Sequence, residues 1–328
     1  MKVAIVGAGA IGAYIGLRLA LAGEEVTFIA RGAKLDALRK QGVKLICADG
    51  KEEVATNLRA TNDYAEAGPQ DLIILAIKAH QVEAIAADVP KMFAPDTVVV
   101  PMQNGIPYWY FHRHGGELAG TCIRSVDPHG TIGELLSPER VIGCVVYPAA
   151  ELLAPGVVQH IEGNRFPVGE LDGSSSARVT RVSQCFVKSG LQSPILPDIR
   201  AEIWLKLWGN LTFNPISALT RATLASICQY PVSRALAVSM MTEAQAIANK
   251  LGITFRVPLE KRVAGAERVG HHKTSMLQDV EAGRPLEVDA LLGSVVELAR
   301  LTNTPSPCID TVYALTKLLG KTLEETRS

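Results

Sequence analysis

Short apolar runs alternate with helical patterns over the first 110 residues of the chain. The runs are rich in Val, Ile and Leu, as expected of buried strands, and they lie at Val3–Val6, Val26–Ala30, Leu72–Ile77 and Thr97–Pro101. Strands that alternate with helices in this way form a parallel sheet with crossover helices. The pattern therefore predicts an α/β domain at the start of the chain.

Residues 43–57 and 101–172 depart from this alternation. Two runs of alternating polarity flank a turn at Ala48–Gly50, and they predict an antiparallel hairpin within 43–57. The stretch from 101 to 172 is irregular and rich in Gly and Pro, with strand-like pieces at Val141–Tyr147 and Val157–Ile161. We expect those pieces to complete the parallel sheet.

Helical periodicity dominates the last third of the chain. After a helix at Ala177–Gly190, helical patterns occur at Ile199–Thr212, Ser233–Leu251, Leu286–Thr302 and Asp310–Leu319, with almost no strand signal between them. We place a domain boundary near Pro197. The fold class is then an α/β domain at 1–197 followed by an all-helical domain at 198–328, and two domains imply a cleft.

Composition narrows the partners of such a protein. The chain has 328 residues, of which 48% are hydrophobic, and its 33 basic side chains balance its 33 acidic ones. No general field attracts nucleic acid or a membrane surface, so the sequence favours a small-molecule partner. It allows a homodimer without requiring one.

Compartment and metal content can also be judged from the composition. The six cysteines are dispersed without C-x-x-C or Cys/His spacing, which predicts reduced thiols and no metal site. The start of the chain imitates a signal peptide, but Arg18 interrupts the apolar run and four glycines lie between Gly7 and Gly16. We therefore expect a cytoplasmic protein.

A glycine-rich loop follows the first predicted strand. It spans Gly7, Ala8, Gly9, Ala10, Ile11 and Gly12 and leads into a helical pattern that ends before Gly23. In G-x-G-x-x-G loops the glycines permit a tight turn, close approach of a pyrophosphate and close packing of helix on strand, while the N–H groups of the helix terminus face the phosphates. Between two strands, this loop predicts a dinucleotide-binding Rossmann domain.

Two cations follow later strands of this domain. Arg31 stands just beyond the second strand, where NAD-binding domains usually carry an acid for the ribose hydroxyls. A guanidinium there favours the 2′-phosphate of NADP, the alternative being a solvated surface arginine. Lys78 follows the strand Leu72–Ile77, and cofactor contact and a solvated cap are equally compatible with its position.

A ridge of polar residues crosses an otherwise apolar helix. Polar side chains recur every fourth residue at Glu202, Lys206, Asn210 and Asn214, so they share one face. Burying an ammonium and two amides is costly without partners, and a ligand is one such partner. The alternative is that Glu202 only neutralises Lys206. Pro215 predicts a kink or a helix end at Asn214.

Three other polar positions match this ridge in character. Ser275 opens the segment Ser-Met-Leu-Gln-Asp, and Glu287 stands near the start of the helix expected at Leu286–Thr302, where an acid also complements the helix dipole. Asn104 lies beyond the strand at Thr97–Pro101, in a turn or facing the cleft. Singly, these signals carry little weight.

Together, these pieces resemble the ketopantoate reductase family. The match runs from the glycine loop through Arg31, Lys78 and Gln103-Asn104-Gly105 to the Lys206/Asn210/Asn214 ridge, the Ser275 segment and Glu287, and it covers nearly the whole chain. The resemblance implies a helical domain like that of 6-phosphogluconate dehydrogenase relatives. It also implies NADPH-dependent reduction of 2-dehydropantoate to pantoate, a step of pantothenate biosynthesis.

The resemblance also assigns roles to these residues. It implies that Lys206 is the general acid, that Glu287 assists catalysis, and that Asn104, Asn210, Asn214 and Ser275 bind the substrate. The loop residues, Arg31, Lys78 and Asn104 would contact the cofactor. A hydride delivered to C2 leaves an alkoxide, which a buried ammonium can protonate.

One departure and two rival functions remain. The segment Tyr108–Glu139 is longer and more aromatic than the family pattern, which could change the substrate. The alternatives are therefore a reductase of another small keto acid, which a substrate panel would reveal, and a non-catalytic NADP sensor, which would have no use for the buried ridge.

Overall fold

The computed structural model describes residues 1–326, which fold as two compact units. The first unit contains residues 1–103, 111–122 and 129–199, and the second contains 104–110, 123–128 and 200–326. Two short segments that precede Pro197 in the sequence therefore belong to the second unit. In the part of the chain that the structure describes, no helix is long and apolar enough to span a membrane.

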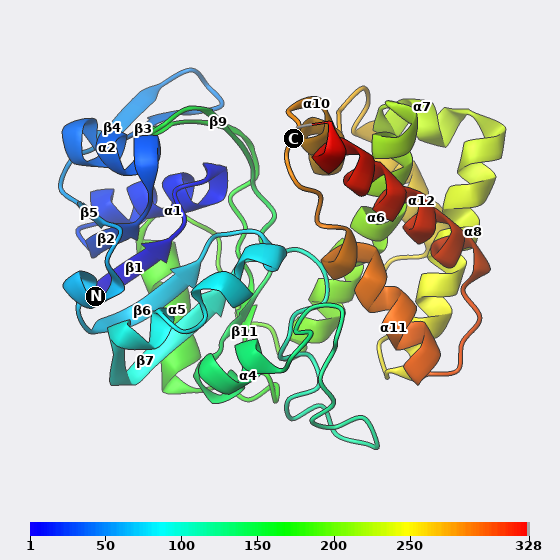
Figure 1. The fold of residues 1–328 in the computed structure, drawn as a ribbon, viewed down its shortest axis with the longest axis horizontal. Coiled ribbons are helices and arrows are strands. Elements are labelled where there is room, and N and C mark those ends of the chain that lie inside the picture. The colour runs from blue at the N-terminus through cyan, green and yellow to red at the C-terminus, as the bar shows by residue number, and fades with distance from the viewer. Residues whose placement is uncertain (327–328) are drawn as a thin grey trace. The chain divides into compact units, whose positions relative to one another are not determined.

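A parallel sheet forms the centre of the first unit, in blue to cyan in Figure 1. Its described strands lie in the order β5-β2-β1-β6-β7, and all neighbours pair in parallel. Their bounds are β1 Lys2–Val6, β2 Glu25–Ile29, β5 Arg59–Thr61, β6 Gln70–Leu75 and β7 Phe93–Pro101. The four predicted strands and their parallel arrangement are confirmed. The short edge strand β5 contains no apolar run, so the hydrophobic pattern does not predict it.

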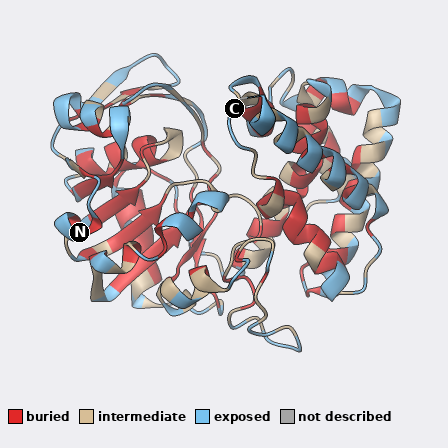
Figure 2. Ribbon diagram, in the orientation of Figure 1, coloured by how far each residue is buried: buried red, intermediate tan, exposed pale blue. Residues whose placement is uncertain are grey.

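The core of this unit is shielded from solvent because β1 and β6 are covered on both faces. Figure 2 shows these strands as buried, and Val3, Ile5, Leu72 and Ile74 have no exposed surface. The strands are continuous in Val, Ile and Leu because a parallel sheet has no solvent face. The first crossover helix, α1 (Ala10–Leu21), buries eight of its residues.

A second, smaller sheet corrects one expectation. The predicted hairpin is present as β3 (Val43–Ile46) and β4 (Glu52–Ala55), which pair antiparallel. However, β10 (Val157–Glu162) pairs with β3 and with β9 (Ala149–Ala154) in the order β4-β3-β10-β9, so it does not complete the parallel sheet. The other strand-like piece reaches the parallel sheet through an isolated parallel bridge between Val141 and Val99 of β7, and its β8 (Gly143–Cys144) pairs with β11 (Val168–Gly169).

Helices and short turns complete the first unit. Their bounds are α2 Gly32–Gln41, α3 Tyr64–Ala67, η1 Ala79–Gln81, η2 Glu83–Ile85, η3 Val89–Met92, α4 Thr131–Leu135, η4 Pro138–Arg140 and α5 Ala177–Lys188. The predicted helix at 177–190 is α5, which begins where the Ser176 side chain accepts from the Val179 N–H.

The regular elements in the described part of the second unit are helices. Its helices are α6 Ile199–Thr220, α7 Leu224–Gln229, α8 Pro231–Lys250, α9 Leu259–Arg268, α10 Ser275–Glu281, a π-helical turn η5 Asp289–Gly293, α11 Ser294–Leu301 and α12 Pro307–Glu325. The all-helical character of this part of the chain is confirmed.

Two helix ends differ from the sequence prediction. The expectation that the helix could end at Asn214 is wrong, because α6 passes through Pro215 and continues to Thr220. Proline costs one hydrogen bond there, but the helix is buried around it and packing outweighs the loss. The helix expected from Leu286 begins at Val288 instead, and its first complete turn is π-helical.

Candidate active site

The glycine loop lies at the carboxyl end of β1, the central strand of the parallel sheet. A side chain at Gly12 would place its Cβ 2.0 Å from the Gly7 carbonyl oxygen, and one at Gly7 would lie 2.5 Å from the Ile77 Cγ2 atom. These two glycines are therefore required by the protein's own packing. Gly7 also has φ of +104°, a conformation that other residues rarely adopt.

Gly9 serves a different purpose. No protein atom lies within 4 Å of the position that its Cβ would take, and Gly9 is the N-cap of α1 without any side-chain cap. The loop is thus open where a ligand's phosphates would meet the first turn of the helix, and the N–H groups there have no side chain competing for them. Among the three glycines, Gly9 is the one that the protein's own packing does not require.

Arg31 and Lys78 both follow strands of the same sheet. Arg31 is exposed and is the N-cap of α2, two residues beyond the end of β2. Lys78 is half-buried, and its backbone N–H donates to Gln81 Oε1 at 3.1 Å. The neighbouring Gln103 side chain donates to the carbonyl oxygens of Leu75 and Ile77 at 2.7 and 3.0 Å, which ties the ends of β6 and β7 together.

The polar ridge of α6 is present in the second unit. Lys206 Nζ donates to Asn104 Oδ1 at 2.7 Å, across 102 residues of sequence. The carboxylate of Glu202, which is fully buried, lies 2.8 Å from the Arg256 guanidinium. Lys206 thus donates to an amide from a remote loop, and the Glu202 carboxylate one turn away has an arginine beside it.

The side chains at the next two ridge positions are at least partly buried. Asn210 is half-buried, and Asn214 is buried with its Nδ2 atom 3.4 Å from Ser275 Oγ. Ser275 is the first residue of α10, whose N-cap Thr274 accepts from the Leu277 N–H. The structure therefore brings Lys206 to Asn104 and Asn214 to Ser275, both on the same face of α6.

Glu287 lies directly before the helical segment that contains η5 and α11. Its side chain is half-buried, and its carbonyl oxygen accepts from the Leu291 N–H at 3.3 Å. The Asn104 loop is attached to this segment, because the Ile106 N–H donates to the Ala290 carbonyl at 3.1 Å. Asn104 and Glu287 thus belong to two segments of the second unit that are hydrogen-bonded together.

Two positioning features were not found from the sequence. Gly105 has φ of +92°, and a Cβ there would lie 2.1 Å from the Ala290 carbonyl oxygen. The Asn-Gly pair signals a turn, but not what packs on it. Gly209 meets a similar constraint, since its Cβ would lie 2.1 Å from an Arg262 guanidinium nitrogen. Arg262 thus lies against the backbone of α6, three residues from Lys206.

The aromatic segment is used largely for packing. Tyr110 and Phe111 have no exposed surface, and Trp109 is 2% exposed. Tyr110 holds α6 in two places: its hydroxyl accepts from Trp204 Nε1 and its carbonyl from Arg200 Nε, both at 2.7 Å. Burial and the nearby charge of Asp127 raise the pKa of Tyr108, so this phenol is neutral.

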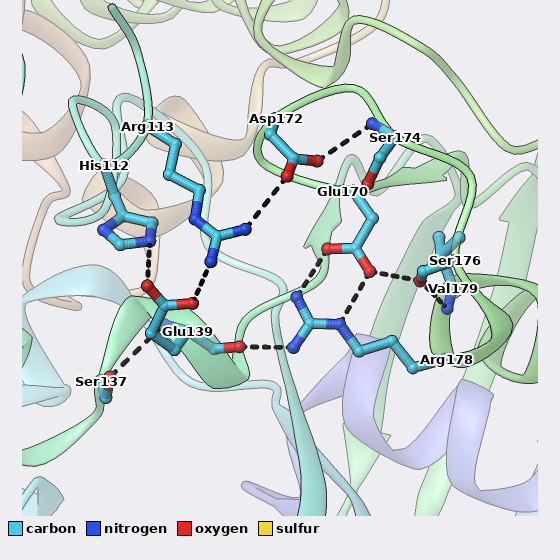
Figure 3. Close-up of polar contacts among 10 residues, drawn as sticks. All are labelled: His112, Arg113, Ser137, Glu139, Glu170, Asp172, Ser174, Ser176, Arg178 and Val179. Atoms are coloured by element: carbon cyan, nitrogen blue, oxygen red, sulfur yellow. Dashed lines mark hydrogen bonds and ion pairs between the residues drawn. The ribbon is translucent and has the colours of Figure 1, made fainter.

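Arg113 and Glu139 of the same segment take part in an ion-pair cluster in the first unit. Figure 3 shows the Arg113 guanidinium between two carboxylates, 2.5 Å from Glu139 and 3.0 Å from Asp172. Arg178 lies beside them and makes a two-pronged contact with the buried Glu170 at 2.6 and 2.7 Å. These side chains pair with one another, so this part of the segment has a structural role.

The fold and these residues together define a dinucleotide-dependent oxidoreductase with an α/β domain and a helical domain. Residues 3–173 match the family description "Ketopantoate reductase PanE/ApbA", and residues 198–320 match its C-terminal counterpart. The chain belongs to the ketopantoate reductase family, whose members use a nicotinamide cofactor.

Individual relatives agree with this membership. The chain is 51% identical to a 2-dehydropantoate 2-reductase of Mesorhizobium japonicum over 98% of both chains. It is 31% identical to a 2-dehydropantoate 2-reductase of Pyrococcus horikoshii, over 97% of both. A crystal structure of a protein from Ralstonia solanacearum MolK2 superposes with a TM-score of 0.93 at 41% identity, covering 98% of each chain.

Proposed function

We propose that this protein reduces 2-dehydropantoate to pantoate with NADPH, and that Lys206 is the general acid. The observation that carries the proposal is the ammonium of Lys206 on a buried helix, held 2.7 Å from the amide oxygen of Asn104. The 51% identity to a 2-dehydropantoate 2-reductase over almost the whole chain supports the choice of substrate.

The residues of the first unit fit a dinucleotide. The space at Gly9 and the uncapped start of α1 suit a pyrophosphate, which would accept hydrogen bonds from the loop and complement the helix dipole. The exposed guanidinium of Arg31 suits a 2′-phosphate, which favours NADPH over NADH. When bound, the nicotinamide supplies the hydride.

Lys206 supplies the proton. Reduction of a ketone turns its oxygen into an alkoxide, and a nearby ammonium stabilises the developing charge and then protonates the oxygen. Asn104 keeps the ammonium in place by accepting a hydrogen bond from one of its three N–H groups. An amide oxygen does this without adding a carboxylate that would compete for the proton.

The remaining polar residues would position the substrate. Asn210, Asn214 and Ser275 are neutral groups, and they can donate hydrogen bonds to a carboxylate without neutralising Lys206. Glu287 can accept from the hydroxyl group that 2-dehydropantoate carries. A keto acid with one carboxylate and one hydroxyl therefore matches this set, and an analogue without the hydroxyl would leave an acceptor unsatisfied.

NADPH oxidation with a panel of keto acids tests the proposal. The panel contains 2-dehydropantoate, the analogue lacking its hydroxyl, and oxaloacetate, a dicarboxylate that tests whether the Arg262 guanidinium adds a second cationic contact. We expect the highest kcat/KM with 2-dehydropantoate. Preferred turnover of another keto acid would reassign the substrate, and binding of NADPH without turnover of any would favour the sensor alternative.

A further inference from the structure

The helix that follows Glu287 contains a break in its hydrogen-bond pattern. The Ser294 N–H bonds to the Asp289 carbonyl, five residues back, instead of to the Ala290 carbonyl, four residues back. This is the pattern of a π-helical turn, and such turns are uncommon and frequently lie at functional sites. The turn therefore needs a physical explanation.

The break changes the partners of one carbonyl group. Ala290 accepts from the Ile106 N–H at 3.1 Å and from the Ser294 hydroxyl at 2.7 Å. Ala290 is 5% exposed and Ser294 is fully buried, so both donors bind where water does not compete. In a continuous α-helix, a backbone N–H of the next turn would occupy this carbonyl. The π-turn thus makes it available to a remote loop.

Close packing holds that loop to the turn. A Cβ on Gly105 would lie 2.1 Å from the Ala290 oxygen, so only glycine lets the loop approach this near. Asn104 directly precedes Gly105, and its side-chain oxygen accepts a hydrogen bond from Lys206. On the helical side of this hydrogen bond, Glu287 precedes Ala290 by three residues in the sequence. One carbonyl therefore links the backbone that carries Asn104 to the backbone that carries Glu287.

The turn is also braced by α12. Tyr313 donates from its hydroxyl to Asp289 Oδ1 at 3.0 Å, and Lys317 Nζ lies 2.9 Å from Asp289 Oδ2. Asp289 is the residue whose carbonyl makes the five-residue bond. The turn is thus fixed by contacts at both Asp289 and Ala290 and is not a frayed helix end.

We propose that the π-turn at Asp289–Gly293 is a positioning device, in which the carbonyl of Ala290, with Ser294 as its second donor, sets Asn104 and therefore Lys206 relative to Glu287. This inference rests on the proposed function, since it assigns catalytic work to Lys206 and Glu287. Ala290, Ser294 and Gly105 are positioning residues, because each acts through a neighbour.

Deletion of Gly293 tests the turn directly. With one residue fewer, the bond from Ser294 to Asp289 becomes an ordinary four-residue bond, and the Val295 N–H reaches the Ala290 carbonyl. Glu287 is then rotated by about 100° about the helix axis relative to α11. We expect kcat with 2-dehydropantoate to fall by roughly 100-fold or more, with cofactor affinity unchanged and the Ile106 amide exchanging with solvent at least about tenfold faster.

A point variant covers the case in which the deletion does not fold. Ser294→Ala should lower kcat by roughly three- to tenfold, as expected for a shifted catalytic group, with little change in the KM for NADPH. Ser189→Ala is the matched control, because the Ser189 hydroxyl also bonds a carbonyl four residues back, at Cys185, in a buried part of the first unit. It should change stability without changing kcat.

Hydrogen exchange at Ile106 separates the two hypotheses. If wild-type protein does not reduce 2-dehydropantoate, the proposed function fails, whereas faster exchange of the Ile106 amide in both variants would still support the link through Ala290. Wild-type kcat in Ser294→Ala, or a protected Ile106 amide in a folded Gly293 deletion, would overturn the positioning role.

Discussion

Lys206 and Asn104 lie 102 residues apart in sequence, and their side chains meet at 2.7 Å within the helical unit. An ammonium held by a neutral amide stays available to an acceptor that carries developing negative charge. This arrangement has consequences that can be measured.

Replacing Lys206 by Ala should lower kcat by roughly 100-fold or more, the usual scale for loss of a general acid. Steady-state kinetics with 2-dehydropantoate and an NADPH titration measure the effect, and cofactor affinity should remain almost unchanged. Lys250→Ala, at the exposed end of α8, is the control. A Lys206 variant that turns over at the wild-type rate would remove this residue from the chemistry.

Replacing Arg31 by Asp should weaken NADPH binding by about 2 kcal/mol or more, because a charge-assisted pair is lost and repulsion of the 2′-phosphate is added. NADH, which lacks that phosphate, should be affected far less. Arg31→Lys should retain part of the preference. Isothermal titration with both cofactors decides the matter, and equal losses for the two would show that Arg31 does not contact the phosphate.

Gly9 and Gly12 should respond differently to alanine. In Gly9→Ala the new Cβ meets no protein atom, so the free energy of unfolding should change by less than about 1 kcal/mol, while NADPH affinity should fall at least about tenfold. In Gly12→Ala the Cβ would collide with the Gly7 carbonyl, and both stability and affinity should fall. Gly320→Ala, where space is also open, controls for the substitution. Unchanged NADPH affinity in Gly9→Ala would contradict a pyrophosphate at this loop.

Replacing Glu287 by Ala should reduce discrimination between 2-dehydropantoate and its analogue without the hydroxyl. The carboxylate is the acceptor that we assign to that hydroxyl, and its loss removes the penalty for leaving an acceptor unsatisfied. The measurement is kcat/KM for both substrates with both proteins. An unchanged ratio would place Glu287 outside the substrate site.

Asp172 should make stability depend on acid pH. Hydrogen bonds from Ser174, together with the Arg113 guanidinium, lower the pKa of this carboxyl from 3.8 to about 2. A folded-state pKa below the unfolded value stabilises the protein above pH 4, and this contribution is lost as the pH falls toward 2. Thermal melts of Asp172→Asn should show a loss at pH 6 that disappears near pH 2. Asp36→Asn, at an exposed position on α2, controls for the Asp-to-Asn substitution itself.

Local patterns determined much of this protein. Four of the five described strands of the parallel sheet can be predicted from the sequence, because buried parallel strands are continuously apolar. The glycine loop can be predicted too, because only glycine tolerates the close contacts at Gly7 and Gly12. The polar ridge on α6 can also be predicted from the sequence, because a four-residue spacing places side chains on one face of any helix. These features depend on neighbours in sequence.

Other features depend on partners that are distant in sequence. The strand β10 joins β3 instead of the parallel sheet, and α6 continues through Pro215, because pairing and packing in the folded chain outweigh local preference. No local sequence pattern predicts that Asn104 accepts a hydrogen bond from Lys206, or that the Ala290 carbonyl accepts one from the Ile106 N–H. A hydrogen bond between remote segments forms only where the tertiary fold brings donor and acceptor within about 3 Å. The spacing of residues along the chain does not predict which remote segments come this close.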